Sequence, residues 1–178
     1  MPRRPASSIA ARLAKVRLFL CDVDGVLTDG SVWMGGGTES KRFNIRDGLG
    51  LTFLQRHGIR VGWISRRPSE ATLERAQNLK IDFLAQRDHG KVEAVQTILR
   101  KTNLDWPDVC YVGDDIVDLG VMKRVGFAVA VSDGVAEAKA AADYVTRAAG
   151  GRGAIREIVE MILKAQDKWN RVIAEYAS

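Results

Sequence analysis

The stretch VRLFLCDVDG at residues 16–25 joins an apolar run to two aspartates and a glycine. The run Val16–Leu20, continued by Cys21, predicts a short buried strand, and the acidic residues before Gly25 predict that a loop follows it. In α/β proteins the loops at the carboxyl ends of strands carry the functional site. This stretch therefore indicates a fold class and a candidate site together.

Apolar strand-like segments alternate with helical patterns along most of the chain. Further strands are expected at residues 59–65, 81–84, 108–112, 127–131 and 144–146, and helices at 47–57, 69–79, 91–101, 119–125, 135–142 and 154–176. This alternation predicts an α/β fold with a doubly wound, mainly parallel, Rossmann-like sheet. No linker or internal repeat divides the chain, so we expect a basic arm at residues 1–15 and a single domain at residues 16–178.

One segment departs from the alternation. Residues 31–44, SVWMGGGTESKRFN, place three glycines between apolar residues, which predicts an inserted β-hairpin. The intervals on either side of Ser65, back to Asp24 and forward to Lys91, are too short to hold a cap domain besides their own helix and strand. Apolar residues on a protruding hairpin favour a contact between subunits, although packing on their own domain stays open. These residues are Val32, Trp33, Met34 and Phe43.

The composition is that of an ordinary globular protein, with 178 residues, 46% hydrophobic and 28% charged. It excludes a disordered or fibrous chain, and no apolar run approaches the ~20 residues of a membrane span. The N-terminus lacks the apolar core of a signal peptide, so we expect a cytoplasmic protein. The net charge of +5 is carried by residues 1–17, which favours a solvated arm over a nucleic-acid partner. Cys21 and Cys110 lie in predicted strands and are expected to be reduced.

Carboxylates follow two of the predicted strands. They are Asp22 and Asp24 after the first, and Asp114, Asp115 and Asp118 after the fourth. Carboxyl ends of parallel strands share one edge of a sheet, where these charges would repel unless a divalent cation such as Mg²⁺ neutralised them.

Two more polar residues follow other predicted strands. Ser65 ends the second, and Lys91 opens a helix after the third. A hydroxyl, a lysine, a helix start and a metal together describe a phosphate site, and a carboxylate beside it can form an aspartyl phosphate. Taken singly, Ser65 is equally compatible with a helix N-cap and Lys91 with a surface lysine. The aspartates, too, are compatible with capped loops.

At these positions the sequence resembles the haloacid dehalogenase-like phosphatases. DVDGVLTDG at residues 22–30 resembles the first motif of the superfamily, Ser65 the second, Lys91 the third and GDDIVD at 113–118 the fourth. With the hairpin, KRFNIRDGLG at 41–50 and GGRGAIRE at 150–157, the resemblance narrows to the 3-deoxy-D-manno-octulosonate 8-phosphate (Kdo 8-phosphate) phosphatase family, over roughly residues 15–163.

The resemblance implies an activity and roles for the site residues. It implies a haloacid dehalogenase fold and hydrolysis of Kdo 8-phosphate in lipopolysaccharide precursor biosynthesis. Asp22 would be the nucleophile and Asp24 the acid and base, while Ser65 and Lys91 would hold the phosphoryl group. Mg²⁺ would be held by Asp22, the backbone carbonyl of Asp24 and Asp114, with Asp115 or Asp118 orienting its surroundings. The resemblance also implies a homotetramer in which neighbouring subunits cover the site.

Arginines are the candidates for binding the sugar carboxylate, because a guanidinium matches a carboxylate with two hydrogen bonds. The candidates are Arg46, Arg67 and Arg152, together with Arg156. Arg67 matches the arginine of the Kdo 8-phosphate branch, whereas a branch acting on a nine-carbon sialic-acid-type phosphate tends to carry glutamate there. The sequence departs from the family at Arg66, where glycine is usual, and at Gly90, where aspartate is usual.

Other functions stay open at this point. A phosphatase for another sugar acid phosphate, such as a sialic acid 9-phosphate, would use the same motifs. A phospho-receiver signalling domain also combines aspartates, a hydroxyl and a lysine on a doubly wound sheet, but its acidic pair is adjacent and its acceptor aspartate follows the third strand. A non-catalytic binding module would be expected to lack Asp22 or Asp24, and both are present.

Overall fold

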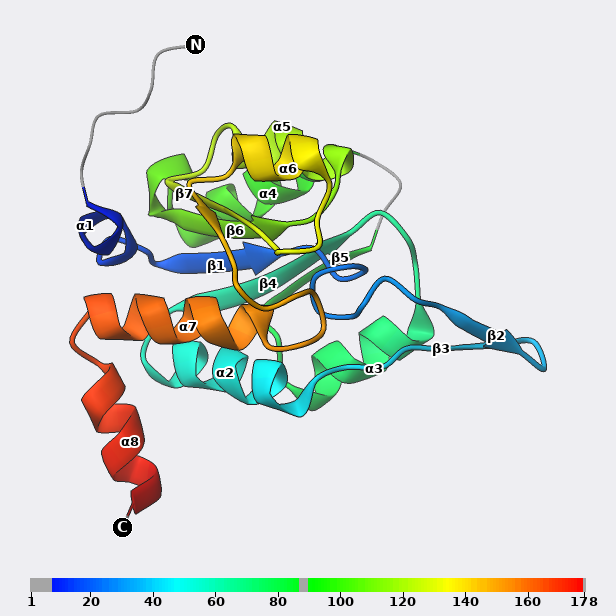
Figure 1. The fold of residues 1–178 in the computed structure, drawn as a ribbon, viewed down its shortest axis with the longest axis horizontal. Coiled ribbons are helices and arrows are strands. Elements are labelled where there is room, and N and C mark those ends of the chain that lie inside the picture. The colour runs from blue at the N-terminus through cyan, green and yellow to red at the C-terminus, as the bar shows by residue number, and fades with distance from the viewer. Residues whose placement is uncertain (1–7, 87–89, 178) are drawn as a thin grey trace.

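The computed structural model describes residues 8–86 and 90–177, so residues 1–7 of the predicted arm lie outside the described part of the chain. Six parallel strands form one sheet in the order β5-β4-β1-β6-β7-β8 (Figure 1). The strands are β1 (Leu18–Cys21), β4 (Arg60–Ser65), β5 (Phe83–Gln86), β6 (Val109–Gly113), β7 (Phe127–Ala130) and β8 (Tyr144–Val145). The predicted parallel α/β sheet is confirmed.

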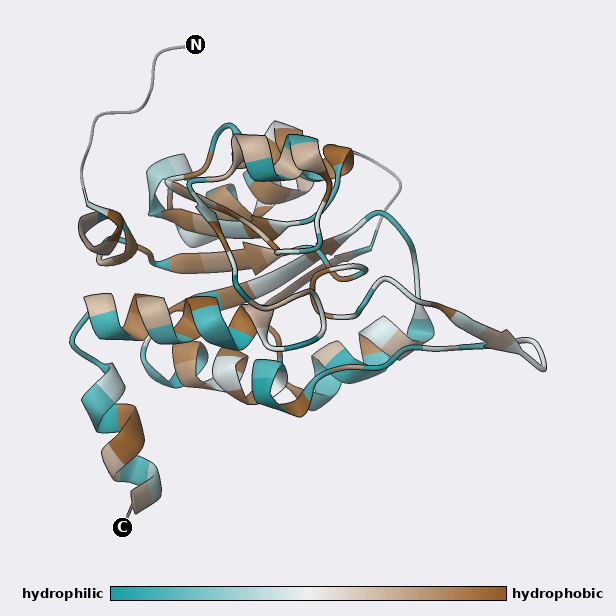
Figure 2. Cartoon of the chain, viewed as in Figure 1, coloured by the Kyte–Doolittle hydropathy of each residue, from teal (hydrophilic) through white to brown (hydrophobic). Residues whose placement is uncertain are grey.

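Helices cover both faces of the sheet, and each face has its own core. In Figure 1, α2 (Ile45–Arg56), α3 (Glu70–Asn78) and α7 (Ala154–Ala165) lie below the sheet, with α4 (Lys91–Thr102), α5 (Leu119–Met122) and α6 (Ala136–Ala141) above it. Along β1, Phe19 and Cys21 join the core under α2 and α7, whereas Leu18 and Leu20 join the core under α4. Both faces of the strand are therefore buried, which explains its uninterrupted apolar sequence and the hydrophobic centre in Figure 2.

The short helix α1 (Ile9–Leu13) lies within the predicted arm, beside the start of β1 (Figure 1). Leu13 is buried in the core under α7. The Arg12 guanidinium forms an ion pair of 2.6 Å with Asp143 and hydrogen-bonds to the carbonyl of Gly126. These contacts attach α1 to the sheet.

The hairpin is present as β2 (Trp33–Gly35) paired antiparallel with β3 (Thr38–Ser40). Its two-residue turn is Gly36-Gly37, both with positive φ (57° and 78°), as a turn of the I′ kind requires. Trp33 and Met34 are 70% and 76% exposed, so they do not pack on their own domain. For Phe43 the alternative of packing on its own domain is correct, because its ring stacks on Trp63 of the core with ring centroids 6.2 Å apart.

No cap domain is inserted into the described chain. Between Gly25 and β4 the chain forms only the hairpin and α2, and between β4 and α4 it forms α3 and β5, with residues 87–89 outside the described part. The site is therefore covered by nothing larger than the hairpin, which extends away from the sheet in Figure 1.

Two sequence-based boundaries are wrong. The predicted helix at 154–176 breaks after Ala165 and restarts as α8 (Trp169–Ala177), because Asp167 takes a left-handed conformation (φ 55°) and the Lys168 amide turns back to Leu163 at 2.8 Å. The third strand begins at Phe83 rather than Ile81. The Ile81 amide donates a 2.9 Å hydrogen bond to the carbonyl of Ala76 at the end of α3, so Ile81 does not start a strand.

The remaining helices agree with the prediction to within a few residues. Short 3-10 turns at Trp106–Asp108 and Ile116–Asp118 precede β6 and α5. None of the helices in the described residues is long and apolar enough to cross a membrane.

Candidate active site

The site forms where strand ends meet. Asp22 directly follows β1, and its amide donates to the carbonyl of Val112 in the neighbouring β6 at 3.0 Å. Asp114 directly follows β6, so the two carboxylates leave adjacent parallel strands at one edge. Ser65 ends β4, the neighbour of β1 on its other side, and Lys91 is the first residue of α4.

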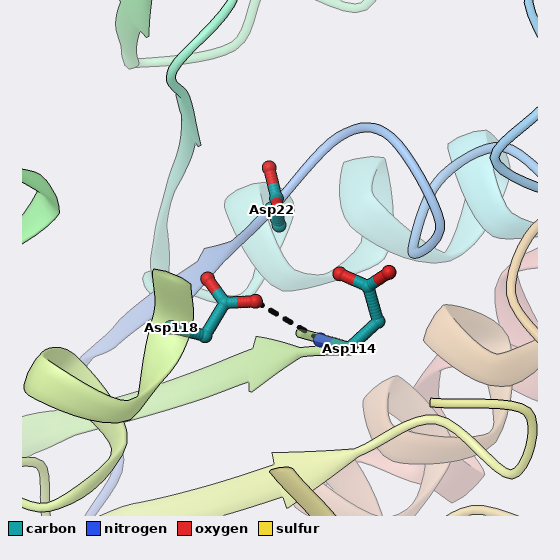
Figure 3. Close-up of side chains that lie close together, drawn as sticks. All are labelled: Asp22, Asp114 and Asp118. Carbon is teal, nitrogen blue, oxygen red and sulfur yellow. Dashed lines mark hydrogen bonds between the residues drawn. The ribbon is translucent and has the colours of Figure 1, made fainter. Parts of the chain in front are cut away.

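Three carboxylates gather at this edge (Figure 3), and a lysine lies among them. Carboxylate oxygens of Asp22, Asp114 and Asp118 lie within 4.8 Å of one another. The Lys91 side chain is buried, and its Nζ lies 2.5 Å from Asp22 Oδ2 and 2.6 Å from Asp118 Oδ1. The surface-lysine alternative for Lys91 is therefore wrong, because this ammonium is held inside the carboxylate cluster.

Both oxygens of Asp118 are already engaged. Oδ1 accepts from the buried Tyr111 hydroxyl at 2.5 Å as well as from Lys91, and Oδ2 accepts from the amides of Asp114 and Asp115 at 3.0 and 3.3 Å. The Asp115 side chain is different, since it is exposed and caps the Ile116 amide at 2.6 Å. Of the two residues expected to orient the surroundings of a metal, Asp118 is the one inside the cluster.

The cluster carries excess negative charge. Burial raises the pKa of Asp22 to about 6, and the charge of Asp118 adds to the rise against the lowering effect of Lys91. Burial raises the pKa of Asp114 to about 7, with further contributions from Asp22 and Asp118. Burial alone would lower the pKa of Lys91, but the charges of Asp22 and Asp118 outweigh it and raise that pKa. Among the described residues of the cluster, one ammonium does not balance three carboxylates, so the site favours a further cation.

The residues present fit a magnesium ion. Asp114 Oδ1 is buried and has no hydrogen-bond partner within residues 8–86 and 90–177, which leaves a hard oxygen donor available to a cation. Gly25 makes room for this carboxylate, since a Cβ there would lie 2.0 Å from Asp114 Oδ2. Asp22 and Asp114 would hold the ion with the backbone carbonyl of Asp24. Asp118, whose oxygens already have partners, would orient these surroundings without binding the ion directly.

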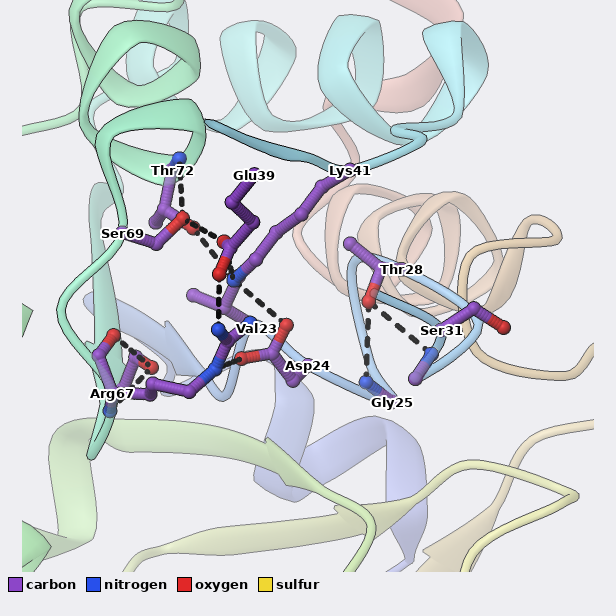
Figure 4. A network of polar contacts seen from close by, with 12 residues as sticks. Val23, Asp24, Gly25, Thr28, Ser31, Glu39, Lys41, Arg67, Ser69 and Thr72 are labelled. Atoms are coloured by element: carbon purple, nitrogen blue, oxygen red, sulfur yellow. Dashed lines mark hydrogen bonds and ion pairs between the residues drawn. The ribbon is translucent and has the colours of Figure 1, made fainter. Parts of the chain in front are cut away.

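Asp24 faces a second polar cluster (Figure 4). The intervening Val23 is buried in the core, as the DxD pattern predicts. Oδ1 of Asp24 forms an ion pair of 2.8 Å with Lys41 Nζ, and Oδ2 lies 3.6 Å from Arg67 Nε. Glu39 completes the cluster, because its carboxylate pairs with Arg67 and accepts a 2.5 Å hydrogen bond from the Ser69 hydroxyl.

Ser65 is buried at the end of β4. Its hydroxyl accepts from the amide of Arg67 and donates to the carbonyl of the same residue, both at 3.1 Å. The N-cap of α3 is instead Ser69, whose hydroxyl accepts from the Thr72 amide at 3.3 Å. The N-cap alternative for Ser65 is therefore wrong, and its hydroxyl lies at the carboxyl end of β4, bonded to the backbone of Arg67.

The predicted arginines separate into two places. Arg67 lies beside Asp24, whereas Arg46 and Arg152 line a groove of about 1180 Å³ between the start of α2 and α7. Arg152 is 63% exposed, with Nη2 4.0 Å from Asp29 Oδ2. Among the described residues that line this groove, none is a strand-end aspartate, so the structure does not bring Arg46 and Arg152 to the carboxylate cluster.

Sequence reasoning missed three residues of the site. Glu39 and Lys41 contact Asp24 and Arg67, and Tyr111 contacts Asp118. Glu39 and Lys41 are two positions apart on a predicted strand, and such residues share a face, so this signal was available. Tyr111 offered no signal, since it stands among apolar residues of a buried strand.

The family follows from comparison with known proteins. Residues 62–158, more than half of the chain, match the family model described as haloacid dehalogenase-like hydrolase. The chain is thus a haloacid dehalogenase-like hydrolase. This match favours a hydrolase over the phospho-receiver alternative.

Relatives narrow the assignment. The chain is 43% identical to 3-deoxy-D-manno-octulosonate 8-phosphate phosphatase KdsC of Yersinia pestis over 92% of this chain and 88% of the relative. It is 42% identical to the protein of the same name from Escherichia coli K12, over 92% and 87% of the two chains. The structure matches that of the Moraxella catarrhalis phosphatase in complex with magnesium ion, phosphate ion and KDO with a TM-score of 0.92 and 37% identity, covering 94% of this chain and 97% of the other. The chain belongs to the Kdo 8-phosphate phosphatase family.

Proposed function

We propose that this protein hydrolyses Kdo 8-phosphate to Kdo and inorganic phosphate in the presence of Mg²⁺, through an aspartyl phosphate on Asp22. This reaction would supply Kdo for lipopolysaccharide precursors. The observation that carries the proposal is the buried Asp22 carboxylate, 2.5 Å from Lys91 and clustered with Asp114 at the edge of the sheet. A carboxylate beside a fixed ammonium and a cation site is equipped to attack a phosphoryl group.

The first half of the reaction transfers the phosphoryl group to the protein. An oxygen of Asp22 forms a bond to phosphorus while the bond from phosphorus to the sugar oxygen breaks. Asp24 gives its proton to that departing oxygen, which leaves as the Kdo hydroxyl. Lys91 and the Ser65 hydroxyl hold the phosphoryl oxygens, and their fixed positions mean that little reorganisation is needed as charge develops.

The second half frees the enzyme. Asp24, now charged, takes a proton from a water molecule as that water attacks phosphorus, and the bond from phosphorus to Asp22 breaks. Asp24 is thereby reprotonated and inorganic phosphate is released. When held by Asp22 and Asp114, Mg²⁺ would supply positive charge against the carboxylates and the phosphoryl oxygens.

The substrate would be recognised by its carboxylate and by shape. Arg67 is the candidate within reach of Asp24, and it is held by Glu39 before substrate binds. Arg46 and Arg152 remain candidates for the sugar carboxylate from their groove, where a neighbouring subunit could complete the contact.

We further propose a homotetramer in which neighbouring subunits cover the open site. The exposed Trp33 and Met34 on the hairpin support this assembly. Residues 16–178 would form the single phosphatase domain, with residues 1–15 as its basic arm. A cytoplasmic location is part of the same proposal, because a charged sugar phosphate does not cross membranes unaided.

The test is phosphate release with Mg²⁺ from Kdo 8-phosphate and a panel of sugar phosphates that includes a sialic acid 9-phosphate. Wild type is measured beside Asp22→Asn and beside Asp105→Asn, a control at an exposed aspartate that caps the turn before β6 and lies outside the motifs. A clear preference for Kdo 8-phosphate, lost only in Asp22→Asn, is the expected result. Preference for another ester would overturn the substrate, and full activity of Asp22→Asn would overturn the mechanism.

A further inference from the structure

We propose that Lys41, which the hairpin carries into the site, positions Asp24 for proton transfer and selects the oxygen that transfers the proton. The proposal rests on the proposed function, in which Asp24 serves as acid and base. Lys41 touches neither substrate nor metal in this role, since it acts through Asp24.

Lys41 is held in an unusual way for a residue of a protruding hairpin. Its side chain is 0% exposed, although lysine is rarely buried unless it is paired. Nζ lies 2.8 Å from Asp24 Oδ1 and donates to the Thr72 hydroxyl at 3.1 Å, with Glu39 Oε1 3.7 Å away. These partners belong to the loop after β1, to α3 and to β3, so the ammonium is fixed from three sides (Figure 4).

The two oxygens of Asp24 therefore have different surroundings and different roles in this proposal. Oδ1, the oxygen paired with Lys41, is buried, whereas the side chain as a whole is 27% exposed. The open surface of the carboxyl group therefore lies away from Oδ1, and Oδ2 is the oxygen that can reach a substrate. The close pair of Oδ1 with Lys41, at 2.8 Å against 3.6 Å between Oδ2 and Arg67 Nε, restricts rotation of the carboxyl group, so Oδ2 keeps one direction relative to the phosphoryl site.

Glu39 balances the charge of this arrangement. The two carboxylates of Asp24 and Glu39 face the two cations of Lys41 and Arg67, so the cluster is balanced. Glu39 also fixes Arg67 and Ser69, which follow β4. The hairpin thus contributes Glu39 and Lys41 to the catalytic site and also exposes a surface to other subunits.

The nature of the leaving group separates positioning of Asp24 from general damage. An alkyl phosphate such as Kdo 8-phosphate needs a proton on its departing oxygen, whereas p-nitrophenolate departs without one. Lys41→Met keeps an unbranched side chain of similar length and removes only the ammonium. The values of kcat and KM are measured on Kdo 8-phosphate and on p-nitrophenyl phosphate. Stopped-flow absorbance follows the first turnover of p-nitrophenyl phosphate.

For Lys41→Met we expect kcat on Kdo 8-phosphate to fall about 100-fold, within the range that acid–base catalysis contributes, with KM changed less than about threefold. The first turnover of p-nitrophenyl phosphate should stay within about threefold of wild type. It should give a burst of one p-nitrophenolate per site before slow turnover, because Asp24 must still activate water in the second half. An equal loss in kcat on Kdo 8-phosphate and in the first turnover of p-nitrophenyl phosphate, or no loss in either, would overturn the proposal.

Two further variants guard against misfolding and charge imbalance. Lys41→Arg keeps a donor and should recover kcat on Kdo 8-phosphate to within about tenfold of wild type. Glu39→Gln/Lys41→Met restores the charge balance without restoring the hold on Asp24, so it should recover thermal stability but not kcat on Kdo 8-phosphate. Recovery of that kcat in the double variant would show that Lys41 acts only through charge balance.

The exposed Lys101 of α4 provides the matched control, as Lys101→Met should match wild type in every assay. Failure of the proposed function is visible separately, because wild type would then release no phosphate from Kdo 8-phosphate. The p-nitrophenolate burst tests Lys41 in either case.

Discussion

The Tyr111 hydroxyl and Lys91 Nζ converge on one atom, Oδ1 of Asp118, at 2.5 and 2.6 Å. Asp118 thereby fixes the Lys91 ammonium that faces Asp22. Lys91 belongs to α4, whereas Asp118 ends the 3-10 turn before α5. The buried tyrosine thus helps to hold the ammonium that contacts Asp22.

Tyr111→Phe should lower kcat about tenfold and the free energy of unfolding by about 1–2 kcal/mol, because a hydrogen bond to a charged acceptor is lost in the interior. Urea unfolding and steady-state kinetics measure the two effects. Tyr176→Phe is the control, since that hydroxyl accepts from Arg56 at the surface and should leave kcat unchanged. Wild-type kcat in Tyr111→Phe would show that Asp118 holds Lys91 without the tyrosine hydroxyl.

Gly25→Ala should weaken Mg²⁺ binding at least tenfold. Gly25 has a φ of 82°, and its new Cβ would meet Asp114 Oδ2 at 2.0 Å, so the carboxylate must move. Gly30→Ala suffers similar backbone strain at φ 77° without a close contact, and should bind Mg²⁺ as wild type does. Calorimetric titration of the metal-free proteins measures the difference, and equal weakening in both variants would assign it to backbone strain alone.

Without metal, the protein should become more stable as pH falls from 8 to 5. The pKa values of Asp22 and Asp114 are raised to about 6 and about 7, above the 3.8 of an unperturbed aspartate. Between about pH 4 and pH 7 the folded state therefore binds more protons than the unfolded state, and the free energy of unfolding rises as pH falls through this window. Thermal unfolding against pH measures it.

Saturating Mg²⁺ should flatten this dependence, because the carboxylates then stay charged beside the cation. Asp114→Asn should reduce it in the metal-free protein. A metal-free wild type that loses stability from pH 8 to pH 5 would contradict the raised pKa values.

Asp47→Ala should lower the free energy of unfolding by about 1–3 kcal/mol. The buried Asp47 of α2 accepts from the amides of Gly153 and Arg156 at 3.1 and 2.8 Å, where α7 begins. Glu160→Ala removes only partly exposed ion pairs on α7 and should cost about 0.5 kcal/mol. Equal losses in the two variants, measured by urea unfolding, would show that the cap across α2 and α7 contributes nothing special.

Trp33→Lys/Met34→Lys should yield a smaller assembly than wild type. The substitutions put charge into an apolar contact, and light scattering after size exclusion reports the mass. Ser31→Lys, on the same exposed segment before the hairpin, should leave the mass unchanged. An unchanged mass in the double variant would remove the hairpin from the proposed interface.

The sequence predicts the parts of the molecule that depend on local pattern. The buried strand before Asp22 and the alternation after it indicate the parallel sheet, and the sheet brings Asp22 and Asp114 together by topology alone. The DxD spacing also places Val23 in the core correctly.

The rest depends on tertiary contacts that no local pattern contains. The left-handed Asp167 ends α7 without a glycine or proline to signal it. The pairing of Lys41 with Asp24 depends on where the hairpin lies in space. The presence of arginines predicts carboxylate binding in general, but only the structure separates Arg67 from the groove of Arg46 and Arg152.

The central position of β1 has a consequence for synthesis on the ribosome. β1 is the first strand made, yet it hydrogen-bonds to β6, whose residue Val112 pairs with Cys21. At the usual elongation rates of ~5–20 residues per second, about 5 to 20 seconds separate the two strands. During that interval the emerging chain presents an apolar strand with one unsatisfied edge, which is a binding opportunity for chaperones that recognise extended hydrophobic segments.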